Sequence, residues 1–352
     1  MNKLTRFAFA LAAASALSLP VAAQDLPATK FNVVGSIGNL SIYTQMEQPF
    51  WSKTIPEKSN GKIQVEAKPF TELGLKGGEI FRLVGAGTVP MATTVLNYNS
   101  GDMPINEAAD LVGLVGSVEE LQKLADIVRP VLAKEYETKH KIKLLGFGSY
   151  HAQIIYCRDK IAGLADIKGK KVRAAGASQH AFVQYLGGSP LNIAFAEVQP
   201  ALAKGVVDCA ITGALSGYRS KWHEAATHLL PVPVNFGLVA TIANLEWWNK
   251  LDPKVQAFLA KEIRELENNI FKLAATETAM GIICNTGTGG QCSVGPAAKM
   301  TLVPVSAADQ ALRQKAFSDA ILPDFAKRCG AACVAEWNAT IGKAMGIVAK
   351  AN

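Results

Sequence analysis

The sequence lacks the motifs that most hydrolases and metalloproteins carry. Its five histidines are scattered, and none forms a two-ligand helical pair such as HExxH. No GxSxG motif occurs, and Gly148-Ser149-Tyr150 does not have the context of a nucleophilic serine. Two close CxxC or Cys/His pairs, which a zinc site would need, are also missing. We therefore predict no catalytic residues, no metal site and no cofactor.

Clustered charge and long apolar runs are equally scarce. The formal net charge is +7, but the lysines and arginines are spread along the chain and are not interleaved with aromatic residues. This distribution argues against a nucleic-acid partner and suits a small anionic ligand. Beyond the first 23 residues, no segment is continuously apolar over the roughly 20 residues that a membrane span requires.

The first 23 residues have the pattern of an export signal. Lys3 and Arg6 form a charged start, residues 7–21 are apolar, and Val21-Ala22-Ala23 fits the small-x-small cleavage pattern. A membrane anchor is the alternative, but the apolar run is short and contains a proline. We therefore expect a soluble mature chain that starts near Gln24 and is exported to the periplasm.

Six cysteines follow the export signal, and an exported location permits disulfides. Six cysteines allow 15 pairings, so the sequence alone does not settle the connectivity. Two pairs are close in sequence, one around a Gly/Thr-rich loop and one four residues apart, which leaves two cysteines in strand-like runs as the third candidate pair. In that order the candidate pairs are Cys284 and Cys292, Cys329 and Cys333, and Cys157 and Cys209.

The mature chain is long for one hydrophobic core and suits two lobes. Segments with strand character alternate with segments of helical periodicity, which favours an α/β fold with largely parallel sheets. The expected strands are 30–36, 62–68, 89–96, 142–147, 153–157, 171–174, 206–211 and 234–243.

Three signals mark the starts of helices. Ser117-Val-Glu-Glu120 is a capping box. Ser178 is placed to cap a second helix, which ends at Gly187-Gly188. Asp252-Pro253 begins an apolar run at helical spacing that, if it continues to Cys284, is about 45 Å long at 1.5 Å per residue. A helix of that length could span two lobes.

One stretch, Asp166-Ile-Lys-Gly-Lys-Lys-Val-Arg-Ala-Ala-Gly-Ala-Ser178, has an arginine in an unusual place. Its lysines belong to a turn, whereas Arg173 ends a short apolar strand and is followed by small residues. The end of a central strand faces the space where open α/β sheets bind ligands, and Ser178 begins a helix whose N-terminus favours anions. A guanidinium can hold a carboxylate with two hydrogen bonds, which lysine cannot reproduce. A structural ion pair with an acidic residue is the alternative.

The region around Arg173 resembles a known family. DIKGKKVRAAGAS, followed by AFVQYLGGSPLNIAFAEVQPALAKGVVDCAITG, is similar to the signature region of substrate-binding proteins of tripartite ATP-independent periplasmic (TRAP) transporters, of the C4-dicarboxylate (DctP) type. The export signal, GKIQVEAKPFTELG after the first helix, and the long helix after NKLDP also resemble that family. The resemblance covers nearly the whole mature chain.

This resemblance implies a two-lobed periplasmic binding protein fold, with crossing strands and a long helix that spans the lobes. Residues 24–150 with about 237–278 would form lobe I, and residues 151–236 with about 279–352 would form lobe II. The resemblance also implies hinge-like closure on an organic acid, delivery of that acid to membrane permease subunits, and no catalysis.

By the same resemblance, Arg173 is the carboxylate-binding arginine, Phe195 the aromatic wall and Thr212 the polar position after the strand that contains Val207-Asp208. The sequence departs from some relatives at two places. Gln153 stands where some acidic-sugar binders have a second arginine, and residues 93–98 (TTVLNY) are uncharged. We therefore expect one main cation and a monocarboxylate ligand, such as an aromatic, 2-hydroxy or 2-oxo acid, rather than a dicarboxylate or sialic acid.

The remaining pocket candidates are aromatic or polar residues: Tyr98, Trp222, Phe236, Ser216 and His151. Each aromatic has a place in the core as its alternative, and the hydroxyls have helix capping. Two other functions stay open. One is an exported α/β enzyme acting on a carboxylate, which would need a catalytic set that is not visible, and the other is a ligand sensor for a signalling receptor.

Overall fold

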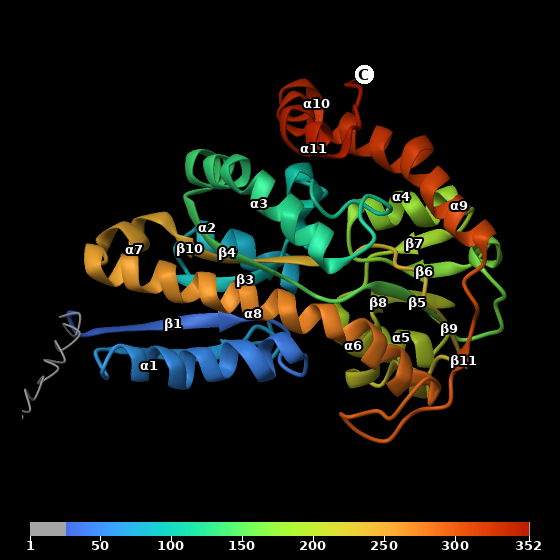
Figure 1. Ribbon diagram of the computed structural model, residues 1–352, viewed down its shortest axis with the longest axis horizontal. Helices are drawn as coiled ribbons and strands as arrows, with labels where there is room; N and C mark the ends of the chain where they lie inside the picture. Colours follow the sequence, from blue (N-terminus) through green and yellow to red (C-terminus); the bar gives the residue numbers. More distant parts are fainter. Residues whose placement is uncertain (1–25, 352) are drawn as a thin grey trace, which may run out of the picture.

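The computed structural model describes residues 26–351, and the predicted export signal lies outside this part of the chain. The described residues form two lobes, each built around a sheet that is covered by helices (Figure 1). We call the lobe around the first sheet lobe I and the other lobe II. None of the helices within these residues combines the length and apolar character that a membrane crossing requires.

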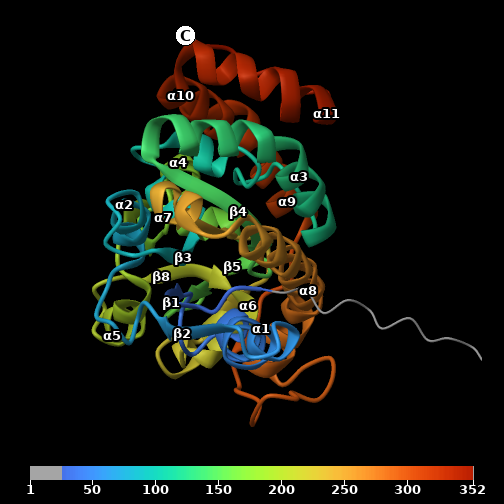
Figure 2. The ribbon, with the colours of Figure 1, turned by 90° about the vertical axis from the view of Figure 1, so that its left-hand side faces the viewer.

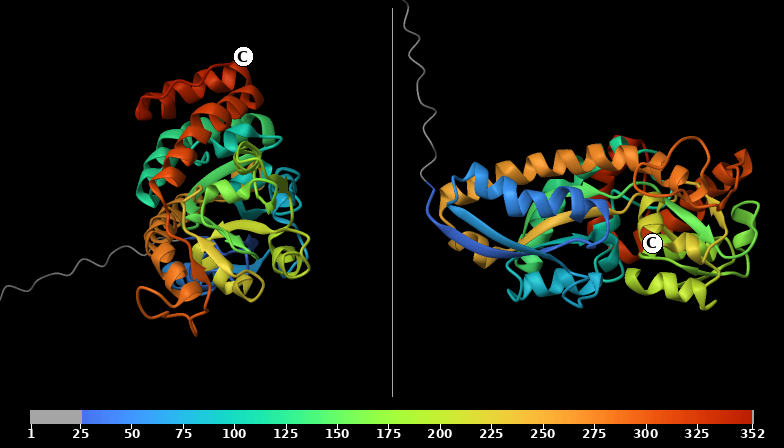
Figure 3. Two further views of the ribbon diagram at one scale, coloured as in Figure 1. Left: turned by 90° about the vertical axis from the view of Figure 1, so that its right-hand side faces the viewer. Right: turned by 90° about the horizontal axis from the view of Figure 1, so that it is seen from below.

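Lobe I contains a five-stranded sheet whose third and fourth strands in spatial order are buried along their whole length, because helices cover both faces of the sheet (Figure 3). In spatial order the strands are β2 (Ile63–Pro69), β1 (Thr29–Gly35), β3 (Met91–Val95), β10 (Leu238–Asn244) and β4 (Ile142–Ser149). The helical segments of this part are η1 (Ile42–Glu47), η2 (Phe50–Thr54), α1 (Ile55–Lys58), η3 (Gly77–Glu79), α2 (Ile80–Gly85), η4 (Leu96–Asn99), η5 (Pro104–Glu107), α3 (Val118–Glu135), η6 (Tyr136–His140) and α7 (Leu245–Lys250).

Lobe II contains a six-stranded sheet whose central strands are also buried. In spatial order the strands are β11 (Thr301–Leu302), β9 (His228–Leu230), β5 (Gln153–Cys157), β8 (Cys209–Gly213), β6 (Lys171–Arg173) and β7 (Ser189–Leu191). The helical segments are η7 (Leu164–Ile167), α4 (Ala177–Tyr185), η8 (Phe195–Glu197), α5 (Val198–Ala203), α6 (Ala214–Arg219) and η9 (Trp222–Glu224).

Both sheets are mixed, so the expectation of largely parallel sheets is wrong. In lobe I, β1 runs parallel to β2 and β3, whereas β10 runs antiparallel to β3 and β4. In lobe II, β6 runs parallel to β7 and β8, whereas β5 runs antiparallel to β8 and β9. The reason is that β10 and β5 each enter their sheet from the other lobe. Their direction is therefore set by the crossing and not by a local strand–helix–strand repeat.

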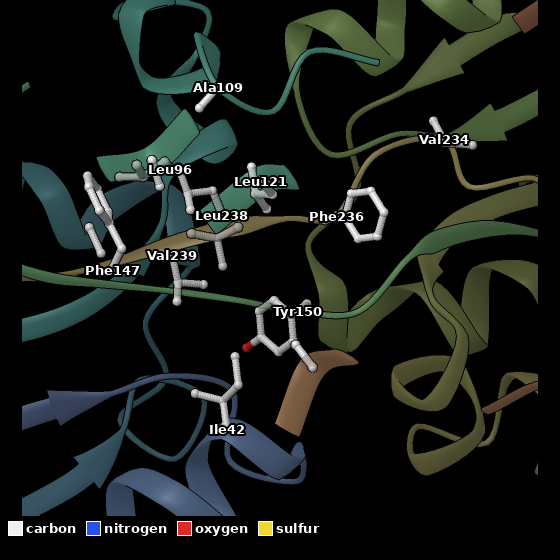
Figure 4. Close-up of a cluster of buried hydrophobic side chains, with 14 of the residues drawn as sticks. Ile42, Leu96, Ala109, Leu121, Phe147, Tyr150, Val234, Phe236, Leu238 and Val239 are labelled. Carbon is white, nitrogen blue, oxygen red and sulfur yellow. The ribbon is translucent and has the colours of Figure 1, made fainter. Parts of the chain in front are cut away.

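Two extended segments cross between the lobes. Residues 150–152 connect β4 to β5, and residues 231–237 connect β9 to β10. They run side by side, because Tyr150 N donates to Gly237 O at 3.1 Å and Gln153 N donates to the carbonyl of Asn235 at 2.7 Å. Figure 4 shows this crossing, with apolar side chains on both segments. The hydrogen bonds make the two crossings a single two-stranded connection.

Helix α8 (Pro253–Thr286) is the third connection and confirms the predicted helix that spans the lobes (Figures 1 and 2). Its 34 residues extend about 51 Å. Ile263 and Ile270 pack against Gly146 and Gly148 of β4, where a Cβ would lie 2.8 Å from either isoleucine side chain. Near the other end, Gly281 lies directly against the first turn of α6 in lobe II. This approach is possible because glycine has no side chain.

Two of the predicted helix starts differ in detail. Ser117 does cap α3, since its side chain accepts from Glu120 N, but the Glu120 carboxylate accepts from Gly116 N instead of closing the capping box. Ser178 does not cap α4. The cap position is Gly176, and Ser178 lies in the first turn of the helix. The small residues after β6 thus let the helix begin earlier than the cap preference of serine suggested.

The C-terminal helices α9 (Ala307–Ala316), η10 (Phe317–Ile321), α10 (Leu322–Trp337), η11 (Asn338–Gly342) and α11 (Lys343–Met345) finish the chain. Our proposed division of the chain places them with lobe II. They also bind lobe I, because Trp337 Nε1 donates to Ala108 O at 2.9 Å and Arg328 forms an ion pair with Glu107. Figure 2 shows α10 and α11 stacked on α3. The C-terminal segment therefore packs across both lobes.

The six cysteines form the three candidate pairs that the sequence suggested. Cys157 and Cys209 stand opposite each other in the antiparallel pair of β5 and β8, with Cα atoms 4.1 Å apart. The Cys284–Cys292 bond closes the loop after α8, and Cys329–Cys333 lies at a kink in α10. The predicted disulfides are thus confirmed.

The three disulfides should differ in their contribution to stability. Loop-closure entropy predicts about 4 kcal/mol for the bond that closes 52 residues and about 2 kcal/mol for the bond that closes four. Replacing Cys157 and Cys209 by alanine should therefore lower the free energy of unfolding more than replacing Cys329 and Cys333. Urea unfolding of the two double variants measures the difference. Equal losses in the free energy of unfolding would contradict the argument from loop-closure entropy.

Candidate functional site

A cleft of about 510 Å³ lies between the lobes, and a narrower pocket adjoins it. Residues from both lobes line the cleft, namely parts of the loop 70–79 and Tyr98 from lobe I, and Arg173, Ala175 and residues 192–197 from lobe II. The narrower pocket shares Tyr98, Arg173, Ala175 and Phe195 with the cleft and extends to the crossing segments at Tyr150 and Gly237. The two hollows therefore form one site around Arg173.

Arg173 is the last residue of β6, and its side chain is only 2 % exposed. Its Nε donates to the carbonyl oxygen of Ile193 at 3.1 Å, and Nη1 donates to that of Ile211 at 2.8 Å. Within residues 26–351, no carboxylate forms an ion pair with this guanidinium, and its polar side-chain neighbour is the Tyr98 phenol. The alternative of a structural ion pair is therefore not what the structure shows.

The protonation of this pair follows from its burial. Burial lowers the pKa of Arg173 from its ordinary value, and the Tyr98 phenol opposes that shift. Burial raises the pKa of Tyr98, and the neighbouring guanidinium opposes it. Because a guanidinium is not deprotonated in proteins, Arg173 remains a cation at neutral pH. The site therefore holds a buried positive charge whose local partners are neutral.

The N-terminus of α4, which follows Arg173 by four residues, does not offer the free amides that we expected for an anion. Ala177 N donates to Ser100 Oγ at 2.9 Å, and Ser178 N donates to Glu107 Oε2 at 3.1 Å. Burial raises the pKa of Glu107, and its ion pair with Arg328 opposes that shift. The protein thus supplies its own acceptors to this helix, and the anion-binding capacity of the site rests on the guanidinium.

Three other predicted site residues lie in the wall of the narrower pocket. Gln153 donates through Nε2 to the carbonyls of Phe236 and His151, at 3.1 and 3.3 Å, which fixes its amide against the crossing. Thr212 lies near the end of β8, and Ser216 lies in the first turn of α6. Strand ends and a helix start thus bring these polar groups to one side of Arg173.

Phe195 forms an aromatic wall of both hollows, and Trp222 lies behind it. The Phe195 ring is 5.6 Å from the ring of Trp222 and 6.0 Å from the Arg173 guanidinium carbon. Trp222 is fully buried, is not part of the lining, and also packs edge-on against Tyr156. Its contacts support the wall from behind, since a rigid aromatic partner restricts the tilt of the Phe195 ring.

His151 also lies outside the lining and joins α8 to α6. Its Nδ1 is 3.0 Å from Glu277 Oε2 on α8, and its Nε2 accepts from Leu215 N at 2.8 Å and from Ser216 N at 3.1 Å. Since Nε2 accepts two hydrogen bonds, the proton of the neutral ring is on Nδ1 and is donated to Glu277. His151 thus holds the start of α6, which carries Ser216 into the pocket.

Phe236 is buried in the crossing and is not part of the lining (Figure 4). A carboxylate holds its segment in place. Asp110 Oδ1 accepts from Phe236 N at 2.8 Å, and Oδ2 accepts from Gly237 N at 2.6 Å and Leu238 N at 3.1 Å. Asn235 Nδ2 donates to the same carboxylate at 3.0 Å. Burial raises the pKa of Asp110 to about 6, although these hydrogen bonds oppose the shift.

Several parts of the site were missed in the sequence. Asn97 and Tyr150 line the narrower pocket, and the loop 70–79 lines the cleft with Lys76 and Glu79. The glycines at 74, 77 and 78 were the available signal for the loop, because a glycine-rich turn after a strand end often faces a ligand. Nothing local marks Asn97 or Tyr150, whose positions depend on contacts between distant segments.

Among residues 26–351, no group of three or more His, Cys, Asp or Glu side chains is arranged to hold a metal ion.

The chain belongs to the family described as bacterial extracellular solute-binding protein, family 7 (DctP), whose model matches residues 40–283. This match confirms the family that the sequence resembles. A curated relative, the uncharacterized protein YiiZ of Salmonella typhimurium, is 26 % identical over 180 residues, or 47 % of this chain and 53 % of the relative. The chain thus spans about half the length of this relative.

Two solved structures have the same fold. One is DctP7 of Bordetella pertussis, an extracytoplasmic solute receptor binding pyroglutamic acid, with a TM-score of 0.78, 22 % identity, and coverage of 88 % of this chain and 100 % of that chain. The other is a TRAP periplasmic solute-binding protein of Rhodoferax ferrireducens with bound malonate, with a TM-score of 0.78, 18 % identity, and coverage of 90 % and 98 %. These likenesses confirm the two-lobed fold.

The pKa of Asp110 predicts how the stability of the chain depends on pH. Its ordinary value is 3.8 and its value in the fold is about 6. Between these values the folded chain binds the proton more tightly than the unfolded chain, so the contribution of Asp110 to stability falls as the pH rises from about 4 to about 6. An asparagine does not titrate. The free energy of unfolding of the wild type, minus that of Asp110→Asn, should therefore fall by up to about 3 kcal/mol across this window.

Urea unfolding at steps between pH 4 and 8 measures this difference, which should be constant above about pH 6. A difference that is the same at every pH would show that Asp110 has an ordinary pKa.

Proposed function

We propose that this chain is the periplasmic solute-binding component of a TRAP transporter, which captures an organic acid between its lobes and delivers it to the membrane permease subunits. The observation that carries the proposal is the buried guanidinium of Arg173 at a cleft between two lobes, without a carboxylate partner among the described residues. A buried charge is costly unless it is paired and hydrogen-bonded. A ligand carboxylate supplies that pair.

The geometry of the cleft supports closure of the lobes as the mechanism. The walls come from both lobes, and the lobes are joined by two crossing segments and one helix that permit a hinge motion. Closure removes water from around the guanidinium, and the charge-assisted hydrogen bonds to a carboxylate strengthen as the local dielectric falls. Phe195 and Tyr98 then enclose the apolar part of the ligand from opposite lobes.

The ligand that fits this chain best is an acid with one carboxylate. The relatives bind different acids, since one structure holds pyroglutamic acid and another holds malonate. The ligand therefore depends on the walls of this pocket. Arg173 is its cation, and Gln153 supplies a neutral amide where a second cation would suit a second carboxylate. We infer a monocarboxylate, with Thr212 and Ser216 as hydroxyl partners.

An exported hydrolase is the second candidate, because Ser216 Oγ, His151 and Glu277 are arranged in the order of a catalytic triad. The geometry argues against it. Ser216 Oγ lies 3.5 Å from His151 Nε2, and that nitrogen already accepts from two backbone amides. Because two backbone N–H groups already occupy the lone pair of this nitrogen, it cannot accept the serine proton. We therefore propose binding without catalysis.

Ester hydrolysis tests this second candidate. Purified chain should not accelerate the hydrolysis of p-nitrophenyl acetate, and Ser216→Ala should leave the rate at the buffer value. A rate that depends on Ser216 would support the enzyme.

Removal of the guanidinium tests the proposed function. Arg173→Ala should weaken the binding of pyroglutamate, or of another acid identified in a thermal-shift screen, by about 100-fold or more. Arg173→Lys should also bind weakly, since an ammonium does not form two parallel hydrogen bonds to a carboxylate. Isothermal titration calorimetry measures the affinity, and thermal unfolding shows that each variant is folded.

Lys171→Ala is the matched control, because Lys171 lies on the same strand, has the same charge, is exposed and is not in the lining. It should bind as the wild type does. Unchanged affinity in Arg173→Ala would refute the proposed anchor.

A further inference from the structure

The carboxamide of Asn97 is buried in the wall of the narrower pocket and has no hydrogen-bond partner there. Asn97 follows β3 in η4 and is 5 % exposed. Its Oδ1 is fully buried without a partner, and its Nδ2 donates to no acceptor among the described residues. The backbone carbonyl of Asn97 accepts from Ser100 N and Ser100 Oγ.

A carboxamide whose oxygen is fully buried and whose two polar atoms both lack a partner among the described residues is unusual, because a buried polar atom without a hydrogen bond costs about 1–3 kcal/mol. Two other buried asparagines of this chain show the ordinary state. Asn244 donates to Val84 O and accepts from Trp247 N, and Asn235 is hydrogen-bonded to Asp110 and Gln179. Asn106 and Asn285 each leave one amide atom unpaired but form hydrogen bonds through the other. Asn97 differs because neither of its amide atoms is paired and because it faces a pocket, where a ligand can complete its hydrogen bonds.

Asn97 lies close to the anchor for the ligand carboxylate. Its side chain packs against Gly176, where a Cβ would lie 2.9 Å from the Cβ of Asn97. Gly176 is three residues beyond Arg173, and both Asn97 and Arg173 line the same pocket. A small acid whose carboxylate is held by Arg173 therefore has its remaining atoms within the space that Asn97 faces.

The charge on this side of the pocket disfavours a second anion. Glu47 is buried, accepts from Ser36 N at 2.7 Å and Ser36 Oγ at 2.8 Å, and has its pKa raised by burial. Its charge acts on Tyr150, whose pKa is raised by burial and also by Tyr98 and Glu47. In the narrower pocket, Arg173 is the cation among the described lining residues.

The cation at the outer cleft does not change this balance. Lys76 lines the cleft, but it is exposed and shares the lining with Glu79 and Glu197. A second carboxylate would therefore lie near Glu79 and Glu197 at the outer cleft, and on the inner side it would lie against Tyr150, on which Glu47 acts from behind the lining.

We propose that Asn97 is a specificity-determining residue that selects acids whose remaining part has a neutral group able both to donate and to accept a hydrogen bond, such as an amide, a lactam or a hydroxyl. This inference rests on the proposed function and extends it to the far end of the ligand. The carboxamide offers one acceptor and two donors. An amide or lactam of the ligand satisfies both of its atoms at once, whereas a hydrocarbon leaves them unpaired.

A matched pair of probes tests the inference. Pyroglutamate has a lactam in its ring, and cyclopentanecarboxylate has a ring of the same size without polar atoms. The wild type should bind pyroglutamate at least about tenfold more tightly than cyclopentanecarboxylate. Asn97→Leu, which has a similar volume, should lose about tenfold or more in affinity for pyroglutamate and should not lose affinity for cyclopentanecarboxylate. Lactate and propionate form a second pair, in which the neutral group is a hydroxyl.

A variant that adds a charge at position 97 gives an independent readout. Asn97→Asp keeps the shape of the side chain but adds a negative charge. It should therefore weaken the binding of both acids in each pair. Asn249→Leu is the control, since Asn249 is an exposed asparagine of α7 and is not in the lining. It should leave both affinities unchanged. Thermal unfolding shows that each variant is folded.

The outcomes separate this inference from the proposed function. Acids that bind in an Arg173-dependent manner, with no preference for the polar member and no effect of Asn97→Leu, would overturn the role of Asn97 and leave the proposed function in place. Arg173-dependent binding of only the apolar members would also overturn it. Absence of Arg173-dependent binding in a screen of organic acids would overturn the proposed function itself.

Discussion

The arrangement of the site depends on one electrostatic constraint, the burial of a guanidinium without a carboxylate. Removing a cation from water costs several kcal/mol, and carbonyl dipoles and a phenol offset that cost only in part. The chain holds Arg173 by two carbonyls, from the segment after β7 and from β8, so the side chain cannot swing out to solvent. This leaves a fixed positive charge in a cleft, and its stabilisation improves when an anion enters and the lobes exclude water.

The segments around Arg173 are held by acceptors that come from distant parts of the chain. Ser100 and Glu107 bind the first amides of α4, and Arg328 from the C-terminal helix pairs with Glu107. Asp110 binds four groups of the crossing segment that leads into β10. These buried carboxylates satisfy backbone amides and leave Arg173 unpaired. The arginine is therefore available to a ligand because the acids near it already have other partners.

Local patterns predicted what depends on neighbouring residues. The long helix follows from apolar spacing after Asp252-Pro253, and the position of Arg173 follows from a strand that ends in small residues. The directions of β5 and β10 could not be predicted, because a strand that crosses from another lobe has the same residue pattern as one that does not. His151 was predicted at the pocket edge, but Glu277, 126 residues later, draws it onto α8. Its position depends on a contact that no local pattern records.

In our two proposals, the anchor and the selectivity belong to different lobes of this molecule. The proposed carboxylate anchor, Arg173, comes from β6 in lobe II, where register with β8 fixes it, whereas Asn97, Tyr98 and Glu47 come from lobe I. On these proposals, a carboxylate binds first to the open protein through lobe II alone. Lobe I contacts the remainder only when the lobes approach, so a poorly matched remainder leaves the Asn97 amide unpaired in the closed state. The free-energy cost of that unpaired amide destabilises the closed complex and not the first complex with the open protein. Discrimination between acids is then expressed as a difference in the stability of the closed form.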